Sequence, residues 1–132
     1  MPIDTNAARR LLGLWAAAPG LLEQLQAERK WSGERLCEAR GAGGCPAETD
    51  ALCAHCEAVG AEIARLAGVM TAVDGLLAEL PPHVREVVRL RYRGQMPYER
   101  IAVRLSYSVD RVRHLKSDAD RFVAERIRTG SV

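Results

Sequence analysis

The sequence predicts an all-α protein, in which an N-terminal antiparallel helical hairpin of coiled-coil type precedes a module of shorter helices. Apolar residues recur every three or four positions over most of the chain, which is the period of one helical face. A glycine-rich connector interrupts this pattern at residues 41–46, and the pair Pro81-Pro82 interrupts it again. These breaks divide the chain into a hairpin region, residues 1–80, and a second module, residues 81–132.

The first half of the hairpin is expected to contain two helical stretches, Asp4 to Ala18 and Leu21 to about Arg40. Pro19-Gly20 should break or kink the helix between them, because proline blocks the preceding turn and glycine weakens the next. An apolar spacing of three and four continues across both stretches, interrupted at Arg29 and Ser32. Its members are Leu11, Trp15, Ala18, Leu22, Leu25 and Leu36.

The helix after the connector has the most regular apolar pattern of the chain. Pro46 suits its first position, and the residue before Pro81 is pushed out of the helical region, so the helix should end near Glu79. Nine apolar residues fill every a and d position of four heptads. They are Leu52, Cys56, Val59, Ile63, Leu66, Met70, Val73, Leu77 and Leu80. Either the preceding helix or the same helix of a second copy is expected to cover this seam, 52–80.

The four cysteines lie around the connector, where a hairpin would bring them near one another. Zinc can be bound by four thiolates, with His55 as a further ligand candidate. However, Cys37, Cys45, Cys53 and Cys56 have the spacing C-x7-C-x7-C-x2-C, with one close pair where structural zinc sites usually have two. Cys56 also occupies a core position of the seam, so no metal site is predicted.

Composition narrows the function classes. The 132 residues include one Phe, two Trp and three Tyr, too few for an aromatic-lined cofactor pocket. The N-terminus lacks the apolar run of a signal peptide, and no apolar stretch reaches the roughly 18 residues of a membrane span, so we expect a cytoplasmic protein without a membrane partner. His83 and His114 lack a carboxylate at useful spacing, and no glycine-rich phosphate loop is present. We therefore predict no enzyme and no cofactor.

Charge is distributed unevenly between the two halves. Residues 1–80 hold seven Lys and Arg against eleven Asp and Glu, a balance of −4, whereas residues 81–132 hold twelve against six, a balance of +6. This asymmetry favours a basic module that binds a polyanion and an acidic region with another role. A solvated helical surface without a partner is the alternative, and charge alone does not separate the two.

The basic module is expected to contain three helices before its tail. The first runs from His83 to Arg93 and ends at Gly94, with Val84, Val87, Val88 and Leu90 facing inward. The second follows Pro97, with Ile101, Ala102 and Leu105 on its apolar side, and the third extends from Val109 to about Arg128, with Val112, Leu115 and Ala119 inward. Ser106-Tyr107-Ser108 forms a turn of the length that a helix-turn-helix needs, with Ser108 as N-cap.

With these positions identified, the stretch from Leu80 to Leu115 resembles region 4 of sigma-70-type transcription factors. The matching residues are Leu80, Pro81, Arg85, Val87, Val88, Leu90, Arg91, Tyr92, Tyr98, Ile101, Ala102, Leu105, Ser108, Val112 and Arg113. It is still more similar to small phage- and prophage-encoded regulators with a helical N-terminal hairpin and one such module. Ser106 stands where this family often has glycine, Pro97 replaces a Ser or Thr, and Asp118 and Asp120 place acid on a helix that is generally basic.

Helical geometry selects candidate DNA-binding residues on the third helix. At 100° per residue, a buried face of Val112, Leu115 and Ala119 leaves Asp110, Arg113, His114, Ser117 and Arg121 pointing away. Arg113 and His114 are the candidates for base edges, Ser117 for a base or a phosphate, and the remaining basic residues for phosphates. The predicted DNA-binding set is Arg100, Arg104, Ser108, Asp110, Arg111, Arg113, His114, Lys116 and Ser117. Tyr98 and Tyr107 are expected to pack rather than stack on bases.

The resulting functional hypothesis is a sequence-specific duplex DNA-binding transcription regulator of phage or prophage type. Its expected partners are double-stranded DNA, host RNA polymerase and a second copy of the chain bound through the 52–80 seam. Two alternatives remain open: a helical adaptor that binds RNA polymerase or a sigma factor without contacting DNA, and a DNA-packaging adaptor resembling small terminases.

Overall fold

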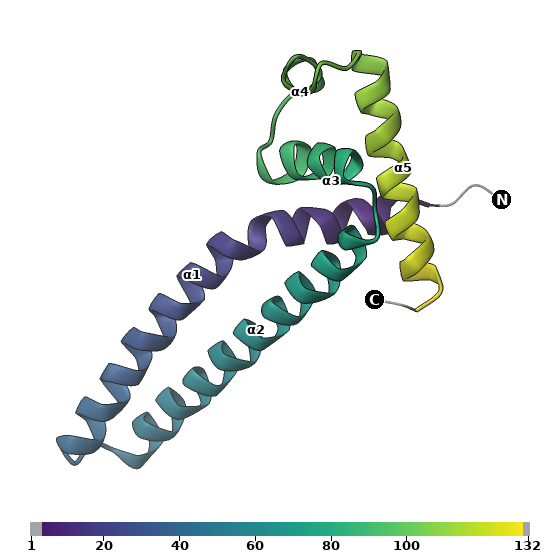
Figure 1. Ribbon diagram of the computed structural model, residues 1–132. Helices are drawn as coiled ribbons and strands as arrows, with labels where there is room; N and C mark the ends of the chain where they lie inside the picture. The colour runs from purple at the N-terminus through teal and green to yellow at the C-terminus, as the bar shows by residue number, and fades with distance from the viewer. Residues whose placement is uncertain (1–3, 131–132) are drawn as a thin grey trace. The chain divides into compact units, whose positions relative to one another are not determined.

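In the computed structural model, which describes residues 4–130, every regular element is a helix (Figure 1). The helices are α1 (Asn6–Gly41), α2 (Pro46–Ala78), α3 (Pro82–Val88), the π-helix η1 (Arg89–Arg93), α4 (Tyr98–Leu105) and α5 (Val109–Arg128). The all-α prediction is therefore confirmed. Within the described residues, none of these helices combines the length and apolar character that crossing a membrane requires.

The chain packs as two compact units. One consists of residues 18–69, and the other combines the chain up to Ala17 with everything from Met70 onward. We call them the hairpin unit and the helix-turn-helix unit. Both long helices contribute to both units, so the units do not follow the Pro81 break. Whether residues 1–80 and 81–132 act as separate functional domains stays a prediction.

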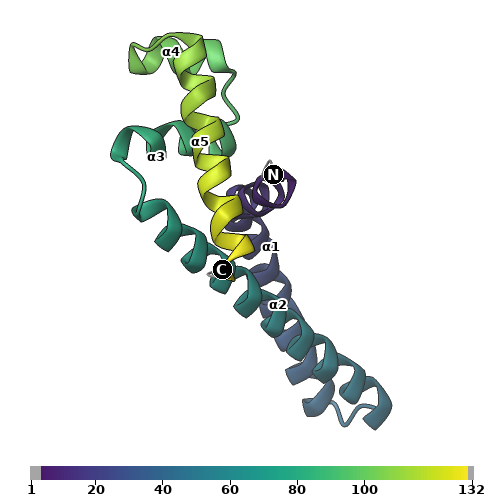
Figure 2. The ribbon, with the colours of Figure 1, turned by 90° about the vertical axis from the view of Figure 1, so that its right-hand side faces the viewer.

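In the hairpin unit, α1 and α2 run side by side in opposite directions (Figures 1 and 2). The turn between them is closed by backbone hydrogen bonds from Gly43 to Arg40 O, 3.3 Å, and from Gly44 to Ala39 O, 2.9 Å. Gly43 has a φ of +68°, the left-handed conformation that glycine adopts without a Cβ penalty. The seam residues Val59 and Leu66 of α2 are buried. The preceding helix therefore covers the seam, as the hairpin alternative predicted.

Two features of α1 differ from the expected pattern. Of the predicted break or kink at Pro19-Gly20, the break is absent, because one helix continues through Pro19 from Asn6 to Gly41. An internal proline costs about 3 kcal/mol, and apolar burial offsets this cost, because Ala18 and Trp15 before it are buried. Ser32 also does not interrupt the packed face. It is fully buried, and its hydroxyl donates to Glu28 Oε1 at 3.5 Å, an atom that lies 2.7 Å from His55 Nε2 of α2.

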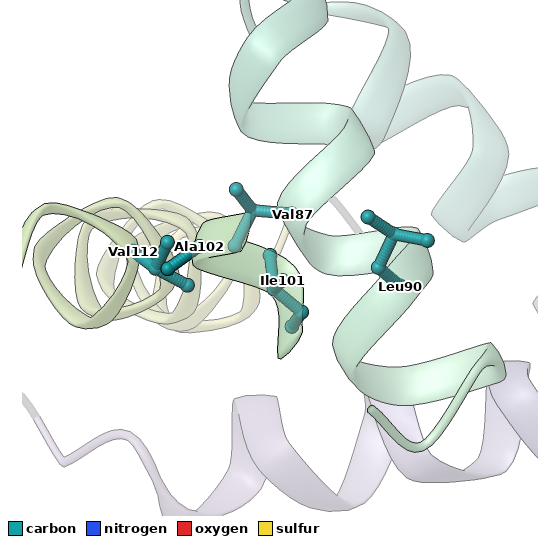
Figure 3. Close-up of a cluster of buried hydrophobic side chains, with 5 residues drawn as sticks. All are labelled: Val87, Leu90, Ile101, Ala102 and Val112. Atoms are coloured by element: carbon teal, nitrogen blue, oxygen red, sulfur yellow. The ribbon is translucent and has the colours of Figure 1, made fainter. Parts of the chain in front are cut away.

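The helix-turn-helix unit is built around a cluster of apolar side chains from four elements. Figure 3 shows Val87, Leu90, Ile101, Ala102 and Val112, all buried, meeting between α3–η1, α4 and α5. The inward positions predicted for residues 83–93 are confirmed.

The first three turns of α1 pack in the same unit. Ala8, Leu12 and Trp15 are buried, and the Trp15 indole donates to Asp74 Oδ1 at 2.9 Å. The Arg93 guanidinium lies 3.7 Å from the centre of the Trp15 ring. A cation over an indole face is attracted by the ring quadrupole. The start of α1 is therefore fixed to the end of α2 and to η1 by both polar and apolar contacts.

Gly94 ends η1, as expected, but it is not the left-handed residue that a glycine at a helix end usually is. Its φ is −79°, and the left-handed residue is the next one, Gln95, at +51°. A Cβ on Gly94 would lie 2.7 Å from the carbonyl oxygen of Leu90, closer than real Cβ contacts. Close approach of the backbone is what requires glycine here.

Replacement of Gly94 with alanine is expected to lower the free energy of unfolding by about 1–3 kcal/mol, as in other overpacked sites. Gly75→Ala is the matched control, because a Cβ there meets nothing within 4 Å. It should raise stability by up to about 1 kcal/mol through helix propensity. Urea denaturation of the two variants measures both effects, and equal shifts would contradict this explanation.

Candidate nucleic-acid interface

The turn between α4 and α5 has the geometry of a tight helix-turn-helix. Ser106 is left-handed, with φ +59° and ψ +41°. The amide of Ser106 donates to Val103 O at 3.3 Å, and that of Tyr107 donates to Ala102 O at 2.9 Å, the two bonds of a Schellman motif. Ser108 then caps α5, because its hydroxyl accepts a hydrogen bond from the Arg111 amide at 3.1 Å. The predicted turn and N-cap are confirmed.

One face of α5 is exposed along its whole first half. Val112 and Ala119 are buried and Leu115 is half-buried against the core. The opposite face is exposed and holds Asp110, Arg113, His114, Ser117 and Arg121. The rotation of α5 therefore agrees with the one inferred from its apolar period.

Aromatic rings hold several arginines near this face. Arg111 lies 4.2 Å from the ring centre of Tyr107, and Arg113 lies 5.5 Å from that of Tyr98. Tyr98 also receives Arg91, at 4.2 Å, whose guanidinium donates to Met96 O at 2.9 Å. Both tyrosines pack against the apolar core, as expected. Such contacts, each worth about 0.5–1 kcal/mol at exposed sites, reduce the freedom of the guanidinium groups before any ligand binds.

The candidate residues of α4 are exposed as well. Arg100 and Arg104 both lie on its outer side. Arg104 is near Glu86 of α3, whose pKa is lowered mainly by a hydrogen bond from Arg89 and further by the positive charges of Arg89 and Arg104. His114 was expected to lack a carboxylate partner, yet its Nε2 lies 3.6 Å from Asp118 Oδ2. Both side chains are exposed, so this contact is weak.

Lys116 differs from the expectation for a phosphate-binding residue. Its ammonium lies 2.6 Å from Asp120 Oδ2, and its side chain is only 12% exposed. Desolvation and the ion pair hold it away from solvent, so it does not extend from the surface toward a ligand. The i, i+4 spacing of Lys116 and Asp120 was the signal that sequence reasoning missed.

Asp120 is a buried anchor rather than an exposed acid. It is 1% exposed, accepts a hydrogen bond from the Tyr92 hydroxyl at 2.7 Å, and lies 3.7 Å from the Arg9 guanidinium of α1. Burial raises the pKa of the Tyr92 hydroxyl, and its hydrogen bond to Asp120 raises it further. Tyr92 therefore stays protonated and keeps donating. No sequence signal joins Arg9, Tyr92 and Asp120, because they are far apart in the chain.

The four cysteines do not form a joint site in the described part of the chain. Cys37 and Cys45 are exposed, Cys53 and Cys56 are half-buried, and all are free thiols. Across residues 4–130, no three His, Cys, Asp or Glu residues come together in a way that would hold a metal ion.

Comparison with known proteins identifies a domain in the helix-turn-helix unit. Residues 70–119 match the family described as Sigma-70, region 4. By this match the stretch is a sigma-70 region 4 helix-turn-helix domain, and domains of that family are non-catalytic DNA-binding modules of transcription proteins. The match begins at Met70, the residue at which the chain re-enters the same compact unit. Searches of curated proteins and of solved structures found no match to the chain.

Ser106→Gly is expected to raise the free energy of unfolding by about 1 kcal/mol, because a left-handed residue with a Cβ carries a penalty of that size. Ser106→Ala keeps the Cβ and should give no such gain. Thermal denaturation separates the two, and a gain of equal size in the alanine variant would show that the backbone conformation is not the cause.

Asp120→Ala should lower the free energy of unfolding by about 3 kcal/mol, because it leaves a nearly buried Lys116 charge and a Tyr92 hydroxyl without their shared acceptor. Asp118→Ala removes an exposed carboxylate from the same helix and should change stability by less than about 0.5 kcal/mol. Chemical denaturation of both variants provides the comparison. Similar losses would mean that Asp120 is not the anchor described.

Proposed function

We propose that this chain is a sequence-specific duplex DNA-binding regulator of transcription, with α5 as the helix that enters the major groove. The observation that carries the proposal is the exposed face of α5, opposite a buried face that belongs to a sigma-70 region 4 domain. A helix whose N-terminal half exposes one face and is capped by a tight turn fits the major groove, which is about 12 Å wide.

The roles of the residues follow from their positions. Arg113 is proposed to bind guanine acceptors in bidentate fashion, with His114 beside it at the base edges. Ser117 donates to a base or a phosphate, and Asp110 favours the helix N-terminus through its charge. Phosphates are bound by Arg100 and Arg104 from α4, and by Arg111 and Ser108 at the start of α5. Lys116 is left out of this set because it is paired with Asp120.

The ion pairs of the module support this assignment of charge. The acids Glu79, Glu86, Asp120 and Glu125 are paired with Arg126, Arg89, Lys116 and Arg128. In contrast, four arginines of the α4–α5 surface have no ion pair with an acid within the described residues: they are Arg100, Arg111, Arg113 and Arg121. Their charges are free to neutralise phosphates, and counterion release would then contribute to affinity.

The hairpin unit is proposed to contact another protein, and we infer a regulator of phage or prophage type from the joining of a long hairpin to a single such domain. The hairpin unit exposes two large apolar side chains, Trp31 at 52% and Leu21 at 37%. Host RNA polymerase or a second copy of the chain is the proposed partner. The N-terminal half has no aromatic-rich basic helix of the kind that melts promoters, so the chain is not expected to direct initiation by itself.

The test starts with selection of bound sequences from random duplexes, which defines the preferred site. Arg113→Ala should then lose about 1–3 kcal/mol of discrimination between that site and a site with one altered guanine. Circular dichroism should not change, because the side chain is exposed. Arg29→Ala, which removes an exposed charge from the hairpin unit, is the control and should keep full selectivity.

Three outcomes would contradict this function. Undiminished selectivity in Arg113→Ala would remove the proposed reader. Absence of duplex binding together with binding to RNA polymerase would favour the adaptor alternative. Binding that is insensitive to ionic strength, with a ring-sized assembly in light scattering, would favour a packaging adaptor.

A further inference from the structure

A polar cavity of about 230 Å³ lies in the helix-turn-helix unit between the start of α1 and the exposed face of α5. Its lining residues are Thr5, Arg9, Ser117, Asp120 and Arg121. Two guanidinium groups and two hydroxyl groups thus surround one small space. All four groups are hydrogen-bond donors. Thr5, just before α1, and Arg9 of α1 lie outside the stretch matched by the family, residues 70–119.

The single acid of the cavity is already neutralised. Asp120 is held by the Lys116 ammonium at 2.6 Å and by the Tyr92 hydroxyl at 2.7 Å. Arg9 approaches the same carboxylate only to 3.7 Å, longer than a strong charge-assisted bond, and its side chain is 57% exposed. Lys116, Arg9 and the lining residue Arg121 carry three positive charges against the one carboxylate of Asp120, a net charge of about +2, which attracts an anion.

The cavity lies on the same face of α5 as the proposed base reader. Ser117 and Arg121 follow Arg113 by four and eight residues, which places them about 6 and 12 Å further along the helix axis. A rotation of 100° per residue turns them by only about 40° and 80° from Arg113. The major groove is about 12 Å wide. If Arg113 contacts bases in the groove, the sugar-phosphate backbone at the edge of the groove therefore lies within reach of Ser117 and Arg121.

We propose that this cavity binds a phosphate of the DNA backbone, so that α1 contributes a contact through Arg9 in addition to those of α4 and α5. The inference depends on the proposed DNA-binding function and adds a site outside the matched domain. Arg9 and Arg121 supply paired donors to the phosphate oxygens, and the Ser117 and Thr5 hydroxyls supply the rest. Such a contact positions the duplex and carries no sequence information.

The experiment measures affinity of the full chain for its selected duplex as a function of salt. Arg9→Ala and Arg121→Ala should each reduce the slope of log affinity against log salt by about 0.9, the release expected for one phosphate contact. The same loss of one phosphate contact predicts that the affinity for the duplex falls roughly eightfold at 0.1 M salt. Discrimination between the selected and altered sites should not change. Arg10→Ala removes an equal charge from the neighbouring position, does not line the cavity, and should retain a slope near that of the unaltered chain.

Several results would overturn the site. Equal slopes in the Arg9 and Arg10 variants would exclude a phosphate contact by Arg9. A loss in Arg9→Ala accompanied by a lower melting temperature, with a normal slope in Arg121→Ala, would show that Arg9 only stabilises the fold. Arg121 makes no ion pair among the described residues, so its variant is not open to that explanation. If the unaltered chain does not bind duplex DNA, the proposed function fails instead.

Discussion

The carboxylate of Asp120 is surrounded by donors from three separate elements: Tyr92 of η1, Lys116 of α5 and Arg9 of α1. Because Asp120 is only 1% exposed, its charged carboxylate is stable only if such hydrogen-bond and ion-pair partners replace the water that it loses on burial. Once they are in place, α5 cannot rotate about its axis without leaving a buried charge unpaired. The same constraint therefore holds α5 at the rotation that exposes Arg113 and His114.

The distribution of the remaining charges follows a related logic. Several acids of the helix-turn-helix unit pair with cations away from the outer α4–α5 surface, such as Glu86 with Arg89 and Glu79 with Arg126. Two arginines of that surface instead lie over tyrosine rings, Arg111 over Tyr107 and Arg113 over Tyr98. An aromatic face orients a guanidinium without satisfying its hydrogen-bond donors, so the group is ordered and still available.

The features that follow from local sequence were predictable. Apolar periods placed α2 and the inward faces of α4 and α5, and the pair Ser106 and Ser108 located the turn. Contacts between distant parts of the chain, which can override a local sequence signal, were not visible in these patterns. Pro19 is a helix breaker by local rules, yet burial of Trp15 and Ala18 carries the helix through it. Lys116 has the charge and the helix position of a phosphate-binding residue, and the fold shows that its ammonium is instead paired with the buried Asp120, one turn further along α5.

The order of the two units along the chain decides which shortened forms of this protein keep the packing of the helix-turn-helix unit. The chain leaves the helix-turn-helix unit after Ala17 and returns to it at Met70, so the segment of the hairpin unit lies between two segments of the helix-turn-helix unit along the sequence. A fragment that begins at Met70 would contain the whole matched family domain but would lose Ala8, Leu12 and Trp15 from its packing. Shortening the hairpin by equal numbers of heptads in both helices preserves those contacts. Hairpin length is thus a variable that evolution or design can change while the helix-turn-helix unit stays intact.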